Sequence, residues 1–525
     1  MSRPRPFSRI AAAVVVLATA YACWVPDLEW LDGKACDDDH PCIRGVCLVG
    51  QCVVSPPGKD ASTPVVVTRA LLHVLEDGGV VAVPETPAAV SVLVETAGGH
   101  VNLTPTVEDA GLMVFWDVPP GGEYMVRLGS RYFVSDAGLV DLGERVPGRA
   151  DLTAPPPGTT LRTELDCMAP WEAADEIWLT AAGAGIPGLP LSALPGWVAP
   201  AAGSGQLRTT QPWTGPLTPG VIRSSRGDRA IYTQMEYRAV TAIVTDGGST
   251  PVEMWLATRA ASDKDLDMAE GAETIFRDCI HGTALKNQPG VVVYGSHFAS
   301  YLEDLGAGAT VSDLTLTVGP VLWPAGPGPQ LSRTKWSTLD DLYGFTTLPD
   351  QDPYPPEWTR QANLVMVAVV PVPLQLQTDG GTTTAFEQAI IASRRAFTLD
   401  GGDLAPALSP PQAVRVNGMP AANGVTGAGM QPVIAWDPPV LGTPAAYEIS
   451  VLREQDPSRQ KAPRLEGTIW TKDTRVRLPP GFFAPRSSYV LRIRAVAAPL
   501  DLPRAPLRAG LPYDEAATVT GLIEP

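Results

Sequence analysis

The residues whose type and spacing carry the most chemistry are seven cysteines. One group lies close together near the start of the chain: Cys36, Cys42, Cys47 and Cys52. Cys167 and Cys279 are the only two in the rest of the chain, and Cys23 is the odd one. An even set of cysteines in an oxidising compartment is expected to pair, and the remaining one needs another fate. We therefore predict a Cys167–Cys279 disulfide, three open pairings within the first group, and modification of Cys23.

The first 22 residues explain that modification. Arg3, Arg5 and Arg9 precede an apolar run over residues 10–20 and the small residues around Ala22, which is the order of a secretory signal peptide. The run is shorter than the ~20 residues that span a bilayer. A cut directly before Cys23 resembles that of bacterial lipoproteins, although bulky Tyr21 replaces the usual small residue. This resemblance implies lipid on Cys23 as the membrane contact of an outer-membrane lipoprotein; cleavage by the ordinary peptidase would instead give a secreted or soluble periplasmic protein.

Residues 23–55 are expected to form a small Cys-rich knob. It contains the repeat Cys-x-x-Gly-x-Cys-x-x-Gly-x-Cys from Cys42 to Cys52, and so short a segment needs cross-links because it buries little core. The knob resembles a fragment of an epidermal-growth-factor module. A zinc site with His40 is disfavoured because no Cys-x-x-Cys pair is present. The Pro- and Ser-rich residues 56–64 are typical of a linker.

Carboxylates and histidines offer weaker candidates. Asp263, Asp265 and Asp267 alternate as in a calcium loop, but Met268 stands where that loop needs glycine. We expect these acids to lead into a helix and predict no metal and no cofactor. His297 beside Ser296 is expected to be an ordinary strand-end histidine, and His281 is expected to pack near Cys279. A hydrolase in the central region would use a site that the sequence does not identify, with either histidine as a possible member.

Two further stretches suggest binding. The tripeptide Arg226-Gly227-Asp228 matches an integrin-recognition motif, but also an ordinary turn. The stretch 336–358 mixes acids with aromatic residues and is expected to be a long loop. Its aromatic faces suit a glycan or peptide partner; the alternative is that they fold inward and attach the loop to a sandwich. These candidate ligand-binding residues are Trp336, Tyr343, Phe345, Tyr354 and Trp358.

Composition indicates the fold class. The chain has 525 residues with 50 Gly and 54 Pro, 45% hydrophobic residues and 18% charged residues, a combination that favours short strands joined by many turns. The formal net charge of -17 excludes nucleic acid as a partner because phosphates repel an acidic surface. We predict an all-β protein of tandem immunoglobulin-like or fibronectin type III-like β-sandwiches after the knob.

Three β-rich regions are expected after the linker. Residues 65–153 alternate in the manner of a sandwich, and Val118–Leu128 resembles a strand entry of carboxypeptidase-regulatory and immunoglobulin-like modules. Residues 154–403 hold six strand candidates in one or two sandwiches. Within them, 268–279 and 385–397 are expected to be helical. Four Asp-Gly-Gly turns, at Asp77, Asp246, Asp379 and Asp400, are expected to reverse strands.

The last region, 404–525, resembles a fibronectin type III domain. Trp436 precedes a strand with Tyr447 on its inner face, and Phe483, Pro485 and Tyr489 have the spacing of a tyrosine corner. These regions together predict a non-enzymatic scaffold or recognition protein of the cell envelope. The alternatives are a glycan- or peptide-binding protein that uses 336–358, and a hydrolase.

Overall fold

The computed structural model describes residues 46–48, 51–53 and 64–525 with short gaps. The gaps are 76–78, 86–89, 106, 110, 120, 216, 219, 244–247, 264, 283–284, 294–296, 299–312, 321–331, 337–341, 350–361, 376–382, 396–402, 456–462 and 509–512. The described part is mostly strands, with three short 3-10 turns, which confirms the all-β class. The turns are η2 (Ala182–Ala184), η3 (Leu191–Ala193) and η4 (Ser224–Arg226). No helical segment in these described residues is long and apolar enough to cross a bilayer.

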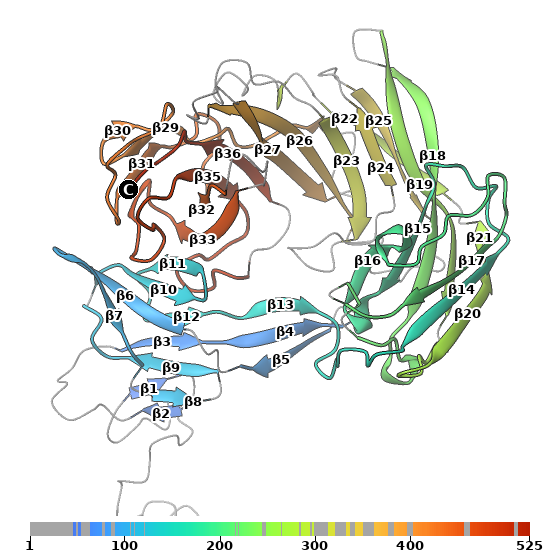
Figure 1. The fold of residues 1–525 in the computed structure, drawn as a ribbon, viewed down its shortest axis with the longest axis horizontal. Helices are drawn as coiled ribbons and strands as arrows, with labels where there is room; N and C mark the ends of the chain where they lie inside the picture. Colours follow the sequence, from blue (N-terminus) through green and yellow to red (C-terminus); the bar gives the residue numbers. More distant parts are fainter. Residues whose placement is uncertain are drawn as a thin grey trace, which may run out of the picture.

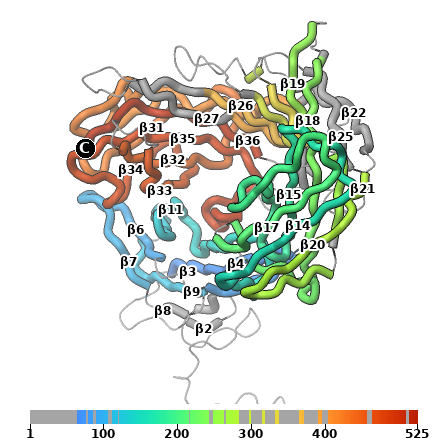
Figure 2. The backbone as a smooth tube through the Cα atoms, turned by 45° about the vertical axis from the view of Figure 1, so that its right-hand side comes forward, coloured from blue at the N-terminus to red at the C-terminus, as the bar shows by residue number. Residues whose placement is uncertain are grey.

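One sheet of 17 strands runs through the whole molecule. Its strands follow the order β7-β6-β10-β11-β33-β32-β35-β36-β27-β26-β23-β24-β19-β18-β15-β16, and β21 pairs with β19. Figures 1 and 2 show the sheet curving as the inner layer of a ring, with smaller sheets outside it. The bounds are β6 (Val90–Thr96), β7 (Gly99–Leu103), β10 (Tyr124–Leu128), β11 (Arg131–Ser135), β15 (Glu176–Ala181), β16 (Ile186–Pro190), β18 (Ala230–Ile243), β19 (Ser249–Asp263), β21 (His281–Gly282), β23 (Asp313–Pro320), β24 (Ser332–Trp336), β26 (Ala362–Gln375), β27 (Thr383–Arg395), β32 (Ala446–Arg453), β33 (Arg464–Thr471), β35 (Tyr489–Ala497) and β36 (Asp514–Val519).

Six smaller sheets complete the fold. Two belong to the first region: β12-β3-β9-β8 and β13-β4-β5, with β3 (Val65–Thr68), β4 (Ala70–Val74), β5 (Val80–Pro84), β8 (Val107–Asp109), β9 (Leu112–Phe115), β12 (Leu139–Asp141) and β13 (Glu144–Pro147). Two belong to the central region: β17-β14-β20 and β25-β22-β28, with β14 (Thr160–Asp166), β17 (Leu207–Pro212), β20 (Glu273–Cys279), β22 (Leu285–Val293), β25 (Leu342–Pro349) and β28 (Asp403–Leu404). The last region supplies β30-β29-β31-β34, with β29 (Gln412–Val416), β30 (Met419–Pro420), β31 (Val433–Asp437) and β34 (Arg475–Arg477); the hairpin β1-β2 (Val46–Leu48, Gln51–Val53) stands alone.

Side-chain alternation explains the layers. Leu207, Thr209 and Gln211 of β17 are buried while the residues between them are exposed, as expected of a strand with one face on a core. In the last region Tyr447, Ile449, Tyr489 and Leu491 share one core with the outer sheet. Separate cores lie between the sheets of the first region, around Phe115 and Phe133, and of the early central region, around Trp213 and Tyr232. Facing sheets with buried inner faces are the sandwiches that the composition predicts.

In the central region, strands up to β21 surround the Trp213 core, and β22, β25 and β28 form a further small sheet. The expected boundary after residue 403 falls within β28, whose Leu404 pairs with Val293 of β22.

Edge pairing joins regions that are far apart in sequence. Strand β11 of the first region pairs in parallel with β33 of the last, from Arg131 opposite Thr468 to Phe133 opposite Trp470. Strand β36 pairs with β27 of the central region. The last region therefore lies beside the first, in one sheet with it (Figure 1).

Both expected helices are wrong. Residues 273–279 form β20, which pairs with β14 over its whole length, and residues 383–395 form β27, paired with β26. In β20 the exposure alternates through Thr274, Ile275 and Phe276. β-Branched and aromatic side chains together with long-range pairing outweigh the local helical pattern.

Strand reversal is confirmed at three of the four Asp-Gly-Gly turns. Asp77, Asp246 and Asp379 each lie between two strands that pair in antiparallel fashion. Asp400 does not fit, because it separates β27 from β28 and the latter pairs with β22.

Candidate functional site

The predicted Cys167–Cys279 disulfide is formed, with Cα atoms 5.1 Å apart. It lies at the ends of the parallel pair β14 and β20, where Asp166 is opposite Cys279. His281 lies beside it as expected, with its Nδ1 atom 3.9 Å from the Cys279 sulfur. The bridge closes a sequence separation of 112 residues.

The described residues reach the Cys-rich knob only in its hairpin. Cys47 in β1 stands opposite Cys52 in β2. Cys23, Cys36 and Cys42 lie outside the described residues, so the lipid on Cys23 and the pairing within the knob stay predictions.

The structure describes the side chains of Asp265 and Asp267, two of the three alternating aspartates. Asp263 ends β19 and Asp265 is exposed, while Asp267 accepts hydrogen bonds from the backbone N–H and hydroxyl of Ser225 at 3.3 and 3.1 Å. Burial raises the pKa of Asp267, but the hydrogen bonds from Ser225 outweigh it and lower the pKa overall. In the described part of the chain no group of three or more His, Cys, Asp or Glu is placed to hold a metal. The helix that these acids were expected to enter is the strand β20 described above.

The Arg-Gly-Asp tripeptide is part of a buried contact. The Asp228 side chain is 1% exposed and forms an ion pair with Arg149, and it also accepts the Arg223 N–H at 2.8 Å. Burial raises the pKa of Asp228 although Arg149 and the Arg223 N–H oppose it. A carboxylate held in this way is not available to a receptor.

The aromatic stretch 336–358 is not one long loop, since residues 342–349 form β25. Trp336 ends β24 and is buried in the core, with 3% of its surface exposed. This agrees with the alternative prediction that the aromatic residues of this stretch fold inward. Tyr343 and Phe345 belong to β25, and Tyr354 and Trp358 lie outside the described residues. His297 is exposed, and its neighbour Ser296 also lies outside the described part.

The tyrosine-corner contact is present in the last region. The Tyr489 hydroxyl accepts the Ala484 N–H at 2.7 Å, and the ring of Phe483 stacks on Tyr489 with centroids 4.4 Å apart. Trp436 packs edge-on against Tyr447 at 5.2 Å.

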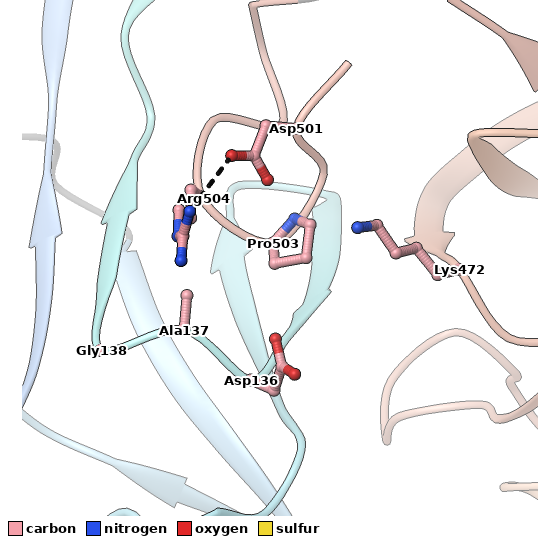
Figure 3. Close-up of a pocket in the computed structure, with 7 residues that line it drawn as sticks. All are labelled: Asp136, Ala137, Gly138, Lys472, Asp501, Pro503 and Arg504. Atoms are coloured by element: carbon pink, nitrogen blue, oxygen red, sulfur yellow. Dashed lines mark ion pairs between the residues drawn. The ribbon is translucent and has the colours of Figure 1, made fainter.

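A polar pocket of about 470 Å³ opens where the first and last regions meet. Its charged side chains, drawn in Figure 3, come from three segments and face a common space. Asp136 follows β11, Lys472 follows β33, and Asp501 and Arg504 follow β35 and form an ion pair at 4.0 Å. Opposite charges around a hollow can hold a small polar or zwitterionic molecule. Ligand sites usually also have apolar walls, and here only Pro503 and Ala137 offer any.

A carboxyl pair lies at the same junction. Burial raises the pKa of Glu123, and a hydrogen bond to Asp473 raises it further, with added repulsion from the charges of Asp136 and Glu95. Glu123 precedes β10 and Asp473 follows β33, so this contact links the two regions. The nearby ion pair of Arg477 with Glu95, at 2.7 Å, also joins them.

The sequence interpretation missed an aromatic cluster on the inner sheet. Trp255 of β19 lies 5.1 Å from Tyr237 of β18, and Arg333 of β24 is stacked 4.1 Å over the Trp255 ring. Glu176 binds Arg333 at 2.7 Å and accepts the Trp178 indole N–H. One feature of the sequence could have indicated this cluster. Tyr237 lies between the charged residues Glu236 and Arg238, which is unusual for a core residue.

Comparison with known proteins adds no family to this description: no protein-family model and no curated protein matches the chain.

Proposed function

We propose that this chain is an exported, lipid-anchored protein of the cell envelope that acts as a non-enzymatic scaffold. Signal-like residues 1–22 direct export, and lipid on Cys23 holds the mature chain at the outer membrane. The last region, with its fibronectin type III-like tyrosine corner, serves as a recognition module within the scaffold.

The observation that carries this proposal is the Cys167–Cys279 bridge. Disulfides of this kind persist in oxidising compartments. With these two cysteines used, the four in the knob can pair among themselves and Cys23 is left over, which supports its lipidation. The continuous inner sheet supports a scaffold role because it fixes the first and last regions against each other.

Membrane extraction followed by intact-mass measurement tests the anchor. We expect the mature wild-type chain in the detergent-extracted membrane fraction, with a mass equal to residues 23–525 plus three acyl chains. Cys23→Ser should move the protein to the soluble fraction, while Cys279→Ser should not. A wild-type mass equal to bare polypeptide would refute lipidation.

Glycan recognition is a second candidate function, and the cluster around Trp255 favours it. Trp255 and Tyr237 are half-buried on the inner sheet beside exposed Glu253, so aromatic faces and carboxylates are close together, as sugar rings and hydroxyls require. A glycan panel titrated against tryptophan fluorescence tests it. Trp255→Ala should abolish any binding that the control Val240→Ala retains; retention of binding by Trp255→Ala would exclude this cluster.

A further inference from the structure

Strand β5 presents an open edge made only of uncharged residues. Its sequence is Val-Val-Ala-Val-Pro, and all five residues are exposed. Val80 is 51% exposed, Val81 43% and Val83 36%. The strand is the last of the sheet β13-β4-β5, and within the described residues it pairs only with β4. Soluble proteins normally protect such an edge with charge, a bulge or a cover.

Two hydrogen bonds fix which backbone groups of β5 point outward. Leu75 N–H bonds Gly79 O, and Glu85 N–H bonds Arg69 O, at the two ends of the β4–β5 pair. Hydrogen-bonded positions alternate along an antiparallel pair, so Val81 and Val83 direct their N–H and C=O groups to β4. The backbone groups of Val80 and Ala82 and the C=O of Pro84 therefore point to the open side.

This pattern is complementary to itself. If two copies of β5 lie antiparallel about a twofold axis at Ala82, the two Ala82 residues exchange both N–H···O bonds. Each Val80 N–H then reaches the Pro84 C=O of the other copy, and the proline, which lacks a donor, is needed only as an acceptor. On the opposite face Val81 of one copy meets Val83 of the other. This single register forms four hydrogen bonds between the two copies and brings four valine side chains into contact.

We propose that β5 is the interface of a homodimer formed by antiparallel β5–β5 pairing. Charge favours a second copy at this place. With a net charge of -17 two molecules repel each other over most of their surfaces, and β5 carries no ionisable group. Pairing about a twofold axis uses the one β5 edge of each molecule, so assembly stops at two.

Sedimentation equilibrium of the full mature chain carrying Cys23→Ser, which removes lipid from the measurement, tests the dimer. We expect a concentration-dependent dimer that tightens as salt screens the repulsion. Val81→Lys and Ala82→Pro should each weaken it at least about tenfold, since charge or a lost pair of hydrogen bonds disrupts the shared register. Val101→Lys, on the open edge strand β7 where Val101 is 49% exposed, is the matched control and should leave it unchanged. Circular dichroism checks that each variant is folded.

Cross-linking tests the register directly. Two Ala82 Cα atoms in a hydrogen-bonded pair would lie about 5.5 Å apart, within the range that a disulfide spans. Ala82→Cys should therefore give an oxidised dimer above the wild-type level, and Val440→Cys, at an exposed loop position, should not. A wild-type chain that stays monomeric at all concentrations, or a Val81→Lys variant that dimerises like wild type, overturns the proposal. An Ala82→Cys variant that dimerises without cross-linking overturns the register.

Discussion

At the scale of single residues, buried charges join the regions of this molecule. Arg149 follows β13, and its N–H bonds Gly183 O at 2.9 Å while its guanidinium pairs with Asp228 and donates to Val221 O. Both side chains are at most 10% exposed. A charge in such a place is tolerated only because its partner is present. The contact therefore anchors the first region to the central one.

Replacing Arg149 should destabilise the fold, because Asp228 would lose the partner of its buried charge. We expect Arg149→Met to destabilise the protein by about 3–5 kcal/mol at neutral pH, because Asp228 is left as a buried unpaired carboxylate. Its pKa, already raised by burial, should rise further, so the loss should shrink as the solution becomes acidic and Asp228 is protonated. Urea unfolding at several pH values measures both effects. Arg226→Ala, which removes an exposed partner of Asp151, is the control and should cost less than about 0.5 kcal/mol.

The carboxyl pair of Glu123 and Asp473 predicts a pH dependence at the other junction as well. The pKa of Glu123 lies above its ordinary value of 4.5 because of burial and then Asp473. The folded chain thus keeps this proton to a higher pH than the unfolded chain, so the contact adds stability as pH falls through the raised pKa and costs stability above it. Because Glu123 is only partly buried, solvent screens the contact and the effect should be below about 1 kcal/mol.

A double-mutant cycle at pH 7 isolates this pair. Glu123→Gln and Asp473→Asn should each stabilise the protein slightly, and the double variant should gain no more than one of them alone. Near pH 4 the gain from Glu123→Gln should disappear. Additive gains, or a gain that persists in acid, would show that the two carboxyls do not interact.

At the scale of elements, alternation made most strands predictable. Tyr447 lies in the core of the last region, on the inner face predicted for it, and the predicted strand entry Val118–Leu128 contains β10. Helices were wrongly predicted at residues 268–279 and 385–397, because the spacing of their apolar residues describes only the local sequence. Their actual state depends on β14 and β26, which are distant partners that no local pattern reveals.

The candidate site was less predictable for the same reason. Counting the cysteines predicted the Cys167–Cys279 disulfide. An even number of cysteines in an oxidising compartment is expected to pair, even when the two partners are far apart in the sequence. The junction pocket depends on Asp136, Lys472 and Arg504, which are unremarkable in sequence and meet only because β11 pairs with β33. The sequence shows Asp228 only as part of the Arg-Gly-Asp tripeptide. Its burial depends on the ion pair with Arg149, which is distant in the sequence.

The disulfide should be a strong constraint on the element pair β14–β20. Replacing both Cys167 and Cys279 with Ala should cost about 4–5 kcal/mol, because the bridge closes a separation of 112 residues and so restricts the unfolded chain. Thermal unfolding with and without reductant measures this. Reductant should lower the melting temperature of the wild type much more than that of the double variant; equal sensitivity would place the redox effect in the knob instead.

At the scale of the whole molecule, the ring depends on the edges of its sandwiches. A sandwich predicted from sequence has edge strands that could pair with other strands. Which edge strands pair with each other depends on their register and on the shapes of the sandwiches, which the sequence pattern does not show. Here β33 is covered on one side by β32 and on the other by β11. The first and last regions are therefore one scaffold, and the segment after β35 adds an ion pair between Arg508 and Asp141 of the first region.

Hydrogen exchange of the full chain tests this architecture most directly. If β11 and β33 pair, both are internal strands, and the amides of residues 468–470 should exchange as slowly as those of β35, within about a factor of ten. Independent sandwiches would leave β33 as an edge, with every second amide open to water. Rapid exchange at Thr468, whose N–H bonds Ser130 O, beside slow exchange in β32 and β35, would contradict the single scaffold.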